Sequence, residues 1–302
     1  MATDAFALVF LMLALGMLCQ RVRLFSDNAA ETLNRVVLYV LLPAAVLRFA
    51  SKLTLDVSLL GLVAVPWLIL LASMAAVEML ARLWRFSPQA KAVLLLCVPL
   101  SNSSFLGYPL VQAMLGDAAL PFAVVYDQFG SFVMLSTWGV WVLARYAGDS
   151  PPSLRDVAQR MIRFPPLIAL LVALTLMPAA PPHVVDAVLQ RLSDAILPVV
   201  SLAVGLQLRL RLSRVHWAPL ASGVALKLLL MPMFAWGIAW TFGLQGAMAQ
   251  VAVLETAMPP MITAGALAIS HRLAPELAAA LVGWGMVLSL GSLPLWHAWL
   301  GP

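Results

Sequence analysis

Three ionisable side chains lie deep inside apolar stretches of the chain, where placing a charge costs at least about 2.5–3.5 kcal/mol in a bilayer. They are Asp127 in VVYDQFGS, Lys227 in ALKLLLMP and Glu255 in VLETAMPP. Groups of this kind pair with one another or serve an ion pathway. One lysine cannot neutralise two carboxylates, so even a structural lysine–carboxylate pair leaves one carboxylate that needs a proton or a cation.

Polar residues also gather at a similar depth in the stretch 92–116, AVLLLCVPLSNSSFLGYPLVQAMLG. The stretch has no charge and exceeds the roughly 20 residues that cross a bilayer. Pro99 and Pro109 interrupt a continuous helix, and the residues between them favour turns. We expect a helix, an unwound polar centre and a half-helix that begins near Pro109. The alternative is a kinked helix whose serines bond back to carbonyls.

A second interrupted stretch, VAVLETAMPPMITAGALAIS at 251–270, is broken at its centre by Pro259 and Pro260. Paired interrupted spans in two halves of a chain indicate a binding site at mid-membrane, which favours a break over a kink. The candidate substrate-binding residues are Ser101, Asn102, Ser103, Ser104, Gly107, Pro109, Thr256, Pro259 and Pro260. The candidate ion-coupling residues are Asp127, Lys227 and Glu255. We expect no metal site, unless a sodium ion binds at Glu255.

The composition fits only a polytopic, all-α membrane protein. The 302 residues are 63% hydrophobic and 10% charged, with a mean hydropathy of +0.98. The net charge of +5 belongs to loops at the cytoplasmic face rather than to a nucleic-acid site. No metalloprotease, nucleophile-elbow or phosphate-loop motif occurs, so an enzyme is not expected.

Ten apolar spans follow one another, separated by short loops. They run at about 4–20, 30–50, 57–80, 91–116, 119–145, 162–178, 186–209, 217–242, 247–271 and 276–300. If the N-terminus is outside, the outer loops hold only Arg48 and Lys52. The inner loops then hold Arg21, Arg23, Arg82, Arg85, Lys91, Arg145, Arg155, Arg160, Arg163, Arg209, Arg211, Arg214 and Arg272. This bias predicts that both termini lie outside.

A loop at 146–161 divides the spans five and five, so the second half must be inverted relative to the first. The repeats would cover about 1–148 and about 160–302 of a single transmembrane domain. Span two, LNRVVLYVLLPAAVL, and span seven, LQRLSDAILPVVSLAV, both place an arginine seven or eight residues before Leu-Pro. This shared pattern supports a 5+5 inverted repeat.

The chain resembles the auxin efflux carrier family, in the bacterial branch that includes malonate and malate permeases. The resemblance rests on LNRVVLYVLLPAAVL, SNSSFLGYPL, RFPPLIALLVAL, LPVVSLAVGLQL, KLLLMP and AMPPMITAGALA, in this order. It implies a ten-helix fold like that of bile-acid symporters and sodium/proton antiporters, with broken helices four and nine crossing. Spans within 4–50 and 162–209 would form a panel, and the remainder the crossing core.

The resemblance also implies roles for single residues. Asn102 matches the family's asparagine before the Phe-x-Gly-x-Pro turn, and Pro109 and Pro259 match its crossover prolines. Glu255 resembles the glutamate that serves sodium in bile-acid symporters, a position where many relatives of this family carry an uncharged residue.

We therefore expect a secondary transporter of a small organic anion, a mono- or dicarboxylate such as malonate or malate, in a bacterial inner membrane. Half-helix N-termini attract anions, so the anion would bind between the two breaks. No cofactor is expected, and a proton or sodium would be the coupling ion. The bilayer is the other partner, with a homodimer as one candidate assembly. The alternatives are a non-transporting receptor, an intramembrane enzyme and, third, a channel.

Overall fold

The computed structural model describes residues 2–26, 28–53, 56–148, 153, 155, 159, 162–208 and 212–301. All regular elements in these ranges are helical, which confirms the all-α class. Seven described segments are long and apolar enough to cross a membrane: Thr3–Arg21, Ala29–Ala50, Ser58–Leu83, Asp117–Ala147, His183–Gln207, Arg214–Thr241 and Pro275–Leu300. The three other expected spans contain shorter helices.

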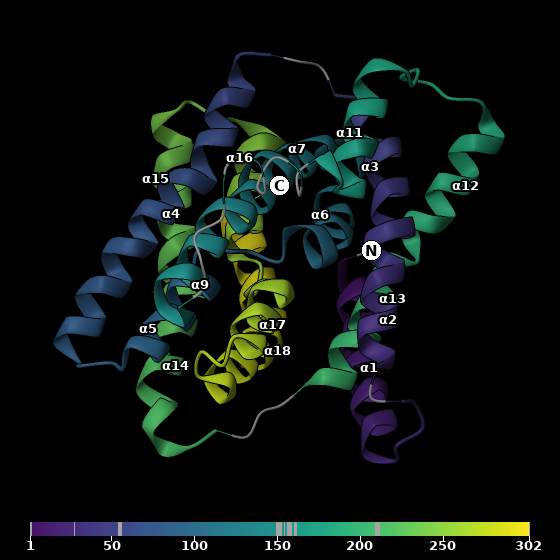
Figure 1. Ribbon diagram of the computed structural model, residues 1–302. Coiled ribbons are helices and arrows are strands. Elements are labelled where there is room, and N and C mark those ends of the chain that lie inside the picture. The colour runs from purple at the N-terminus through teal and green to yellow at the C-terminus, as the bar shows by residue number, and fades with distance from the viewer. Residues whose placement is uncertain are drawn as a thin grey trace. The chain divides into compact units, whose positions relative to one another are not determined.

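The helices belong to two units. The first comprises Met1–Leu55, Ser104–Val124 and Met161–Leu208. Its helices are α1 (Ala2–Arg21), α2 (Ala29–Val36), α3 (Leu42–Ala50), α6 (Tyr108–Leu115), α11 (Pro165–Thr175), α12 (His183–Asp194) and α13 (Ile196–Gln207). Helix α1 packs along α13 (Figure 1). The two backbones meet at Gly16 and Gly205, where a Cβ on Gly16 would lie 2.6 Å from the Leu202 carbonyl oxygen.

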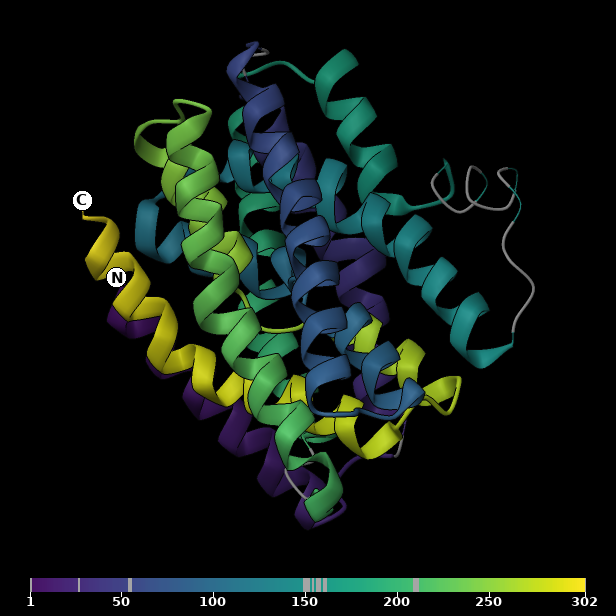
Figure 2. The same ribbon diagram turned by 90° about the vertical axis from the view of Figure 1, so that its left-hand side faces the viewer.

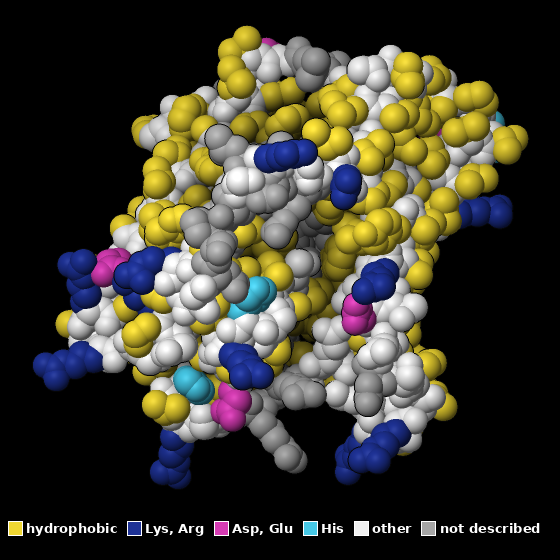
Figure 3. All heavy atoms as spheres, in the orientation of Figure 1, with side chains coloured by type: hydrophobic (Ala, Val, Ile, Leu, Met, Phe, Trp, Pro, Cys, Tyr) yellow, Lys and Arg dark blue, Asp and Glu magenta, His cyan; other side chains and the backbone are white. Residues whose placement is uncertain are grey.

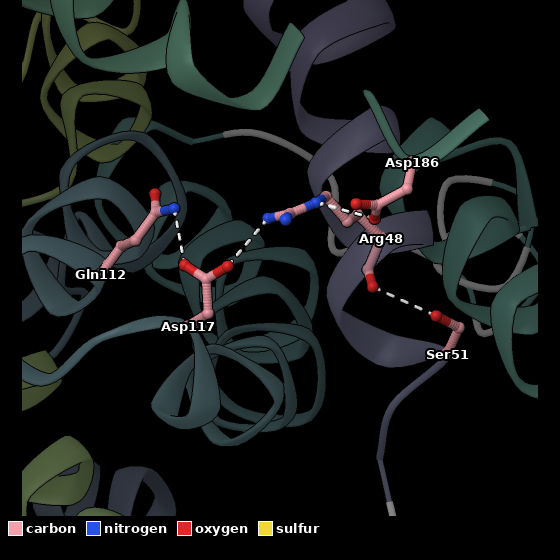
Figure 4. Close-up of polar contacts among 5 residues, drawn as sticks. All are labelled: Arg48, Ser51, Gln112, Asp117 and Asp186. Carbon is pink, nitrogen blue, oxygen red and sulfur yellow. Dashed lines mark hydrogen bonds and ion pairs between the residues drawn. The ribbon is translucent and has the colours of Figure 1, made fainter. Parts of the chain in front are cut away.

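A buried arginine joins three elements of this first unit (Figure 4). Arg48 lies in the last turn of α3 and is only 5% exposed. Its Nε donates to Asp186 of α12 at 3.0 Å, and its Nη1 donates to Asp117 at 3.2 Å. Gln112 of α6 donates to the same Asp117 at 2.9 Å. The charge count placed Arg48 in an outer loop, which is wrong, because the side chain is a buried cross-link.

The second unit comprises Asp56–Ser103, Val125–Arg160 and Arg209–Pro302. Its helices are α4 (Ser58–Leu83), α5 (Pro88–Cys97), α8 (Phe132–Met134), α9 (Val140–Ala147), α14 (Trp217–Ala225), α15 (Met231–Thr241), α16 (Gly246–Ala257), α17 (Ile262–Ser270) and α18 (Pro275–Leu300). Helix α4 lies beside α15 in both views (Figures 1 and 2), and α16 packs against both. Helix α7 (Leu120–Tyr126) continues from the first unit into the second.

Wide π-helical turns interrupt several helices. Three of them, η1 (Val37–Leu41), η2 (Ser103–Gly107) and η7 (Leu226–Leu230), end two residues before a proline, at Pro43, Pro109 and Pro232. A proline ring clashes with the carbonyl four residues earlier, so the preceding turn widens. Lys227 lies in η7, and Asp127 opens another such turn, η4 (Asp127–Ser131). Such turns are frequent at functional sites.

Candidate functional site

The two interrupted stretches pair with each other at their breaks. Helix α5 ends at Cys97 and α16 ends at Ala257. The Asn102 N–H donates to the Pro259 carbonyl at 2.9 Å, and the Met261 N–H donates to the Leu100 carbonyl at 2.9 Å. Ser101 and Pro260 thereby form an isolated antiparallel bridge. Non-helical backbone at membrane depth is tolerated where protein satisfies it, so these bonds explain how both breaks persist. The stretches are broken rather than kinked.

The first break is shorter than its sequence indicates. Helical geometry resumes at Ser103 in η2, and Gly107 has a helical φ of −58° and ψ of −55°. The α-helix α6 begins at Tyr108, next to Pro109 as expected, but the π-helical turn η2 precedes it, so the proline lies inside a continuing helix. Ser104, Gly107 and Pro109 belong to the unit of α6, whereas Ser101, Asn102 and Ser103 belong to the unit of α5.

Lys227 links the two breaks from a third helix. Its side chain is 0% exposed, and its Nζ donates to Ser101 Oγ at 2.5 Å and to the Thr256 carbonyl at 3.1 Å. These bonds use two of the three donors of the ammonium group. The structural pair of Lys227 with one carboxylate stays a prediction.

Asp127 is bonded to the first break. It is 1% exposed, and its Oδ1 accepts a 2.5 Å hydrogen bond from the Ser103 hydroxyl. The neighbouring Gln128 donates to its Oδ2 at 2.8 Å. Both of these hydrogen bonds come from neutral donors, which spread the charge of the carboxylate without removing it.

The second break has its own polar link. The Thr256 hydroxyl donates to the Ala252 carbonyl at 2.7 Å and lies 2.9 Å from the Tyr126 hydroxyl. Because a threonine hydroxyl carries one proton, Tyr126 is the donor of the second bond. Tyr126 and Gln128 were not among the candidates from the sequence. The sequence could have indicated them, because both are polar residues that flank Asp127 in an apolar stretch.

Several buried polar atoms of this cluster have no hydrogen-bond partner among the described residues. Both carboxylate oxygens of Glu255 are in this group, and its side chain is 0% exposed. The same holds for Asn102 Nδ2, Gln128 Oε1 and Ser131 Oγ. The Glu255 carboxylate is close enough to Asp127 and Lys227 to interact with both charges. Buried polar groups are nearly always satisfied, so these atoms are the natural contacts for an ion, a proton or a substrate.

Comparison with known proteins gives matches along nearly the whole chain. A family model described as membrane transport protein matches residues 1–297. An uncharacterized transporter of Methanothermobacter thermautotrophicus is 31% identical, over 98% of this chain and 97% of its own length. An uncharacterized transporter of Methanocaldococcus jannaschii is 25% identical, over 97% of each chain. Auxin efflux carrier component 6 of Arabidopsis thaliana is 28% identical over 40% of this chain and 21% of its own.

Proposed function

Because the chain belongs to the membrane transport protein family, we propose that it carries a small organic anion across the bilayer by alternating access. The family match and the partial match to an auxin efflux carrier confirm the resemblance drawn from the sequence motifs. They also make this integral membrane protein a transporter rather than an enzyme. The observation that carries the substrate proposal is the buried polar cluster at the paired breaks, whose donor and acceptors lack partners in the part of the chain that the structure describes.

The proposed architecture is a ten-span inverted repeat in which helices at 4–50 and 162–209 form a panel. Its support is the pairing of two broken stretches, one in each half of the chain, at Ser101 and Pro260. Broken helices related in this way line the substrate sites of many secondary transporters. In this arrangement the panel and the crossing core move against each other to expose the site to each side alternately.

The cluster can bind a carboxylate through neutral and charged donors. Asn102 Nδ2 is buried and has no partner within the described ranges, and the Lys227 ammonium has a third donor beyond its two hydrogen bonds. The first N–H groups of α17 follow directly after the second break and favour negative charge. A mono- or dicarboxylate such as malonate or malate suits these donors. We propose that Asn102 orients the substrate while Lys227 supplies the attraction.

Glu255 is the proposed coupling residue, with a proton as the coupling ion. Its two oxygens are buried and have no hydrogen-bond partner in the described part of the chain, so a bare charge there is costly and protonation removes that cost. Sodium is the weaker alternative at this position. The Thr256 carbonyl beside Glu255 already accepts a hydrogen bond from the Lys227 ammonium, so that charge opposes a second cation at the same carbonyl.

Uptake into proteoliposomes tests the substrate class. Purified protein is reconstituted, and the uptake of labelled malonate, malate, lactate and a neutral amino acid is compared with that of empty liposomes. We expect saturable uptake of at least one carboxylate and none of the amino acid. Binding of a carboxylate without uptake would favour the receptor alternative. The absence of both binding and uptake would reject the proposed substrate class.

A further inference from the structure

A second polar site lies away from the breaks, in the unit of α4. A cavity of about 480 Å³ opens where α4, α5 and α9 meet, and its charged lining comprises Glu78, Arg82, Lys91 and Arg145. Phe86 and Tyr146 add aromatic walls. Figure 3 shows basic side chains gathered around an acidic one over these elements. None of these residues has a part in the proposed transport cycle.

Glu78, the one acidic residue in the described lining of this cavity, contacts two of the three basic residues. Glu78 accepts a 2.7 Å hydrogen bond from Arg82 Nε, and its second oxygen contacts Lys91 Nζ. Arg145 has no carboxylate partner among the described residues and instead lies over the Tyr146 ring, with Cζ 5.6 Å from the ring centroid. Counted over the described lining residues, the cavity therefore has an excess of two positive charges, one of them on the Arg145 guanidinium, which can bind an oxyanion. Guanidinium groups match phosphate oxygens in geometry and charge.

The surroundings of the cavity suit an amphipathic ligand. Met79 and Leu83 follow Glu78 and Arg82 on α4 and are 63% and 69% exposed. Two exposed tryptophans lie close to lining residues in the chain. Trp84 contacts the lining residue Phe86 edge-on, and Trp141, four residues before Arg145 on α9, stacks on Trp138. Tryptophan is enriched at the level of lipid headgroups, so these residues support a position for the cavity near headgroup phosphates.

We propose that this cavity binds the phosphate of an anionic phospholipid, with the acyl chains along the exposed apolar side of α4. The predicted topology places Arg82, Lys91 and Arg145 at the cytoplasmic face, where anionic lipids attract basic residues. A soluble phosphate compound shares the chemistry of the headgroup, but it has no acyl chains that would pack against the exposed apolar side of α4. The site is separate from the substrate cluster and does not depend on which anion is transported.

Native mass spectrometry of the full chain in detergent tests this proposal by titration with phosphatidylglycerol, phosphatidylcholine and glycerol 3-phosphate. The variant is Arg145→Gln, and the control is Arg21→Gln, which removes an exposed basic residue from the end of α1. We expect phosphatidylglycerol to bind in preference to phosphatidylcholine. One basic residue contributes about 1 kcal/mol near anionic lipid, so Arg145→Gln should weaken binding about five-fold. Arg21→Gln should leave it unchanged.

Two kinds of result would overturn the proposal. Equal binding of both lipids, or equal affinity in the two variants, would show that the cavity does not recognise the headgroup. Glycerol 3-phosphate binding as tightly as phosphatidylglycerol would identify a soluble phosphate ligand instead of a lipid. Thermal unfolding of lipid-free Arg145→Gln is measured in parallel, so that weaker binding can be separated from misfolding.

Discussion

The backbone N–H of Asn102 donates to the carbonyl oxygen of Pro259 at 2.9 Å, and this bond joins two breaks that lie in opposite halves of the chain. The Asn102 backbone is therefore structural, while its side-chain Nδ2 has no partner among the described residues. The backbone of Asn102 thus joins the two breaks, and its side chain places an available N–H donor at the same point. Stability and substrate binding can thus be separated by substitution there.

Asn102→Ala removes the free side-chain donor and keeps the backbone bond to Pro259. We expect substrate binding to fall at least ten-fold, because a hydrogen bond to a charged group contributes about 1.5–3 kcal/mol, while the unfolding temperature changes little. Isothermal titration of purified protein with its transported carboxylate measures the affinity. Ser222→Ala is the control, because the hydroxyl of this buried residue donates within its own helix, to the Ala218 carbonyl. An affinity equal to that of the control would show that Asn102 does not contact substrate.

Lys227→Met removes the ammonium group that serves both breaks. Ser101 Oγ and the Thr256 carbonyl each lose a donor, so the free energy of unfolding should fall by about 1–3 kcal/mol. Unfolding by dodecyl sulfate titration measures this change. The exposed Lys52→Met should stay within about 0.5 kcal/mol of the wild type.

The double variant Lys227→Met/Glu255→Gln tests whether the two charges interact. If Lys227 offsets the buried Glu255 charge, Glu255→Gln should restore part of the stability that Lys227→Met loses, with a coupling of about 0.5–3 kcal/mol. Strict additivity of the two single changes would mean that Lys227 acts only as a hydrogen-bond donor.

Arg48→Gln should lower the free energy of unfolding by about 1.5–3 kcal/mol, because Asp117 and Asp186 both lose a charged hydrogen-bond donor. The matched control is Arg35→Gln, whose pair with Glu31 has side chains 71% and 63% exposed. Exposed pairs of this kind contribute little, so the control should change stability by no more than about 0.5 kcal/mol. The same dodecyl sulfate titration compares both. A similar small change in the two variants would contradict a stabilising role for the Arg48 cross-link.

The sequence predicts the apolar segments, both broken stretches and the three buried charges. These features depend on the length of an apolar run and on the positions of prolines, which can be read from the local sequence. The hydrogen-bond partners of the buried charges could not be predicted from the sequence. Lys227 reaches Ser101 and Thr256 only through tertiary packing, and Arg48 has the local appearance of a loop charge although Asp117 and Asp186 enclose it. The π-helical turn that begins at Ser103 could not be predicted either, because it accommodates Pro109 without ending the helix.

Cysteine labelling tests the predicted topology. The native Cys19 and Cys97 are buried, so new cysteines at the exposed Ser26 and Gln245 can be read separately. In intact cells an impermeant maleimide should label Gln245→Cys, while Ser26→Cys should react only after permeabilisation. The reverse pattern would place both termini inside and reject the orientation drawn from the arginine and lysine bias.

The most direct test of the account is gradient-driven carboxylate uptake by wild type and Glu255→Gln in proteoliposomes, with counterflow exchange measured in the same preparations. Glutamine mimics the protonated acid, so the account predicts that a pH gradient accelerates wild-type uptake and has no effect on the variant. Counterflow exchange should survive in Glu255→Gln, which shows that the site still binds and moves substrate. A pH gradient that drives uptake equally in wild type and Glu255→Gln would contradict the assignment of Glu255 as the coupling residue.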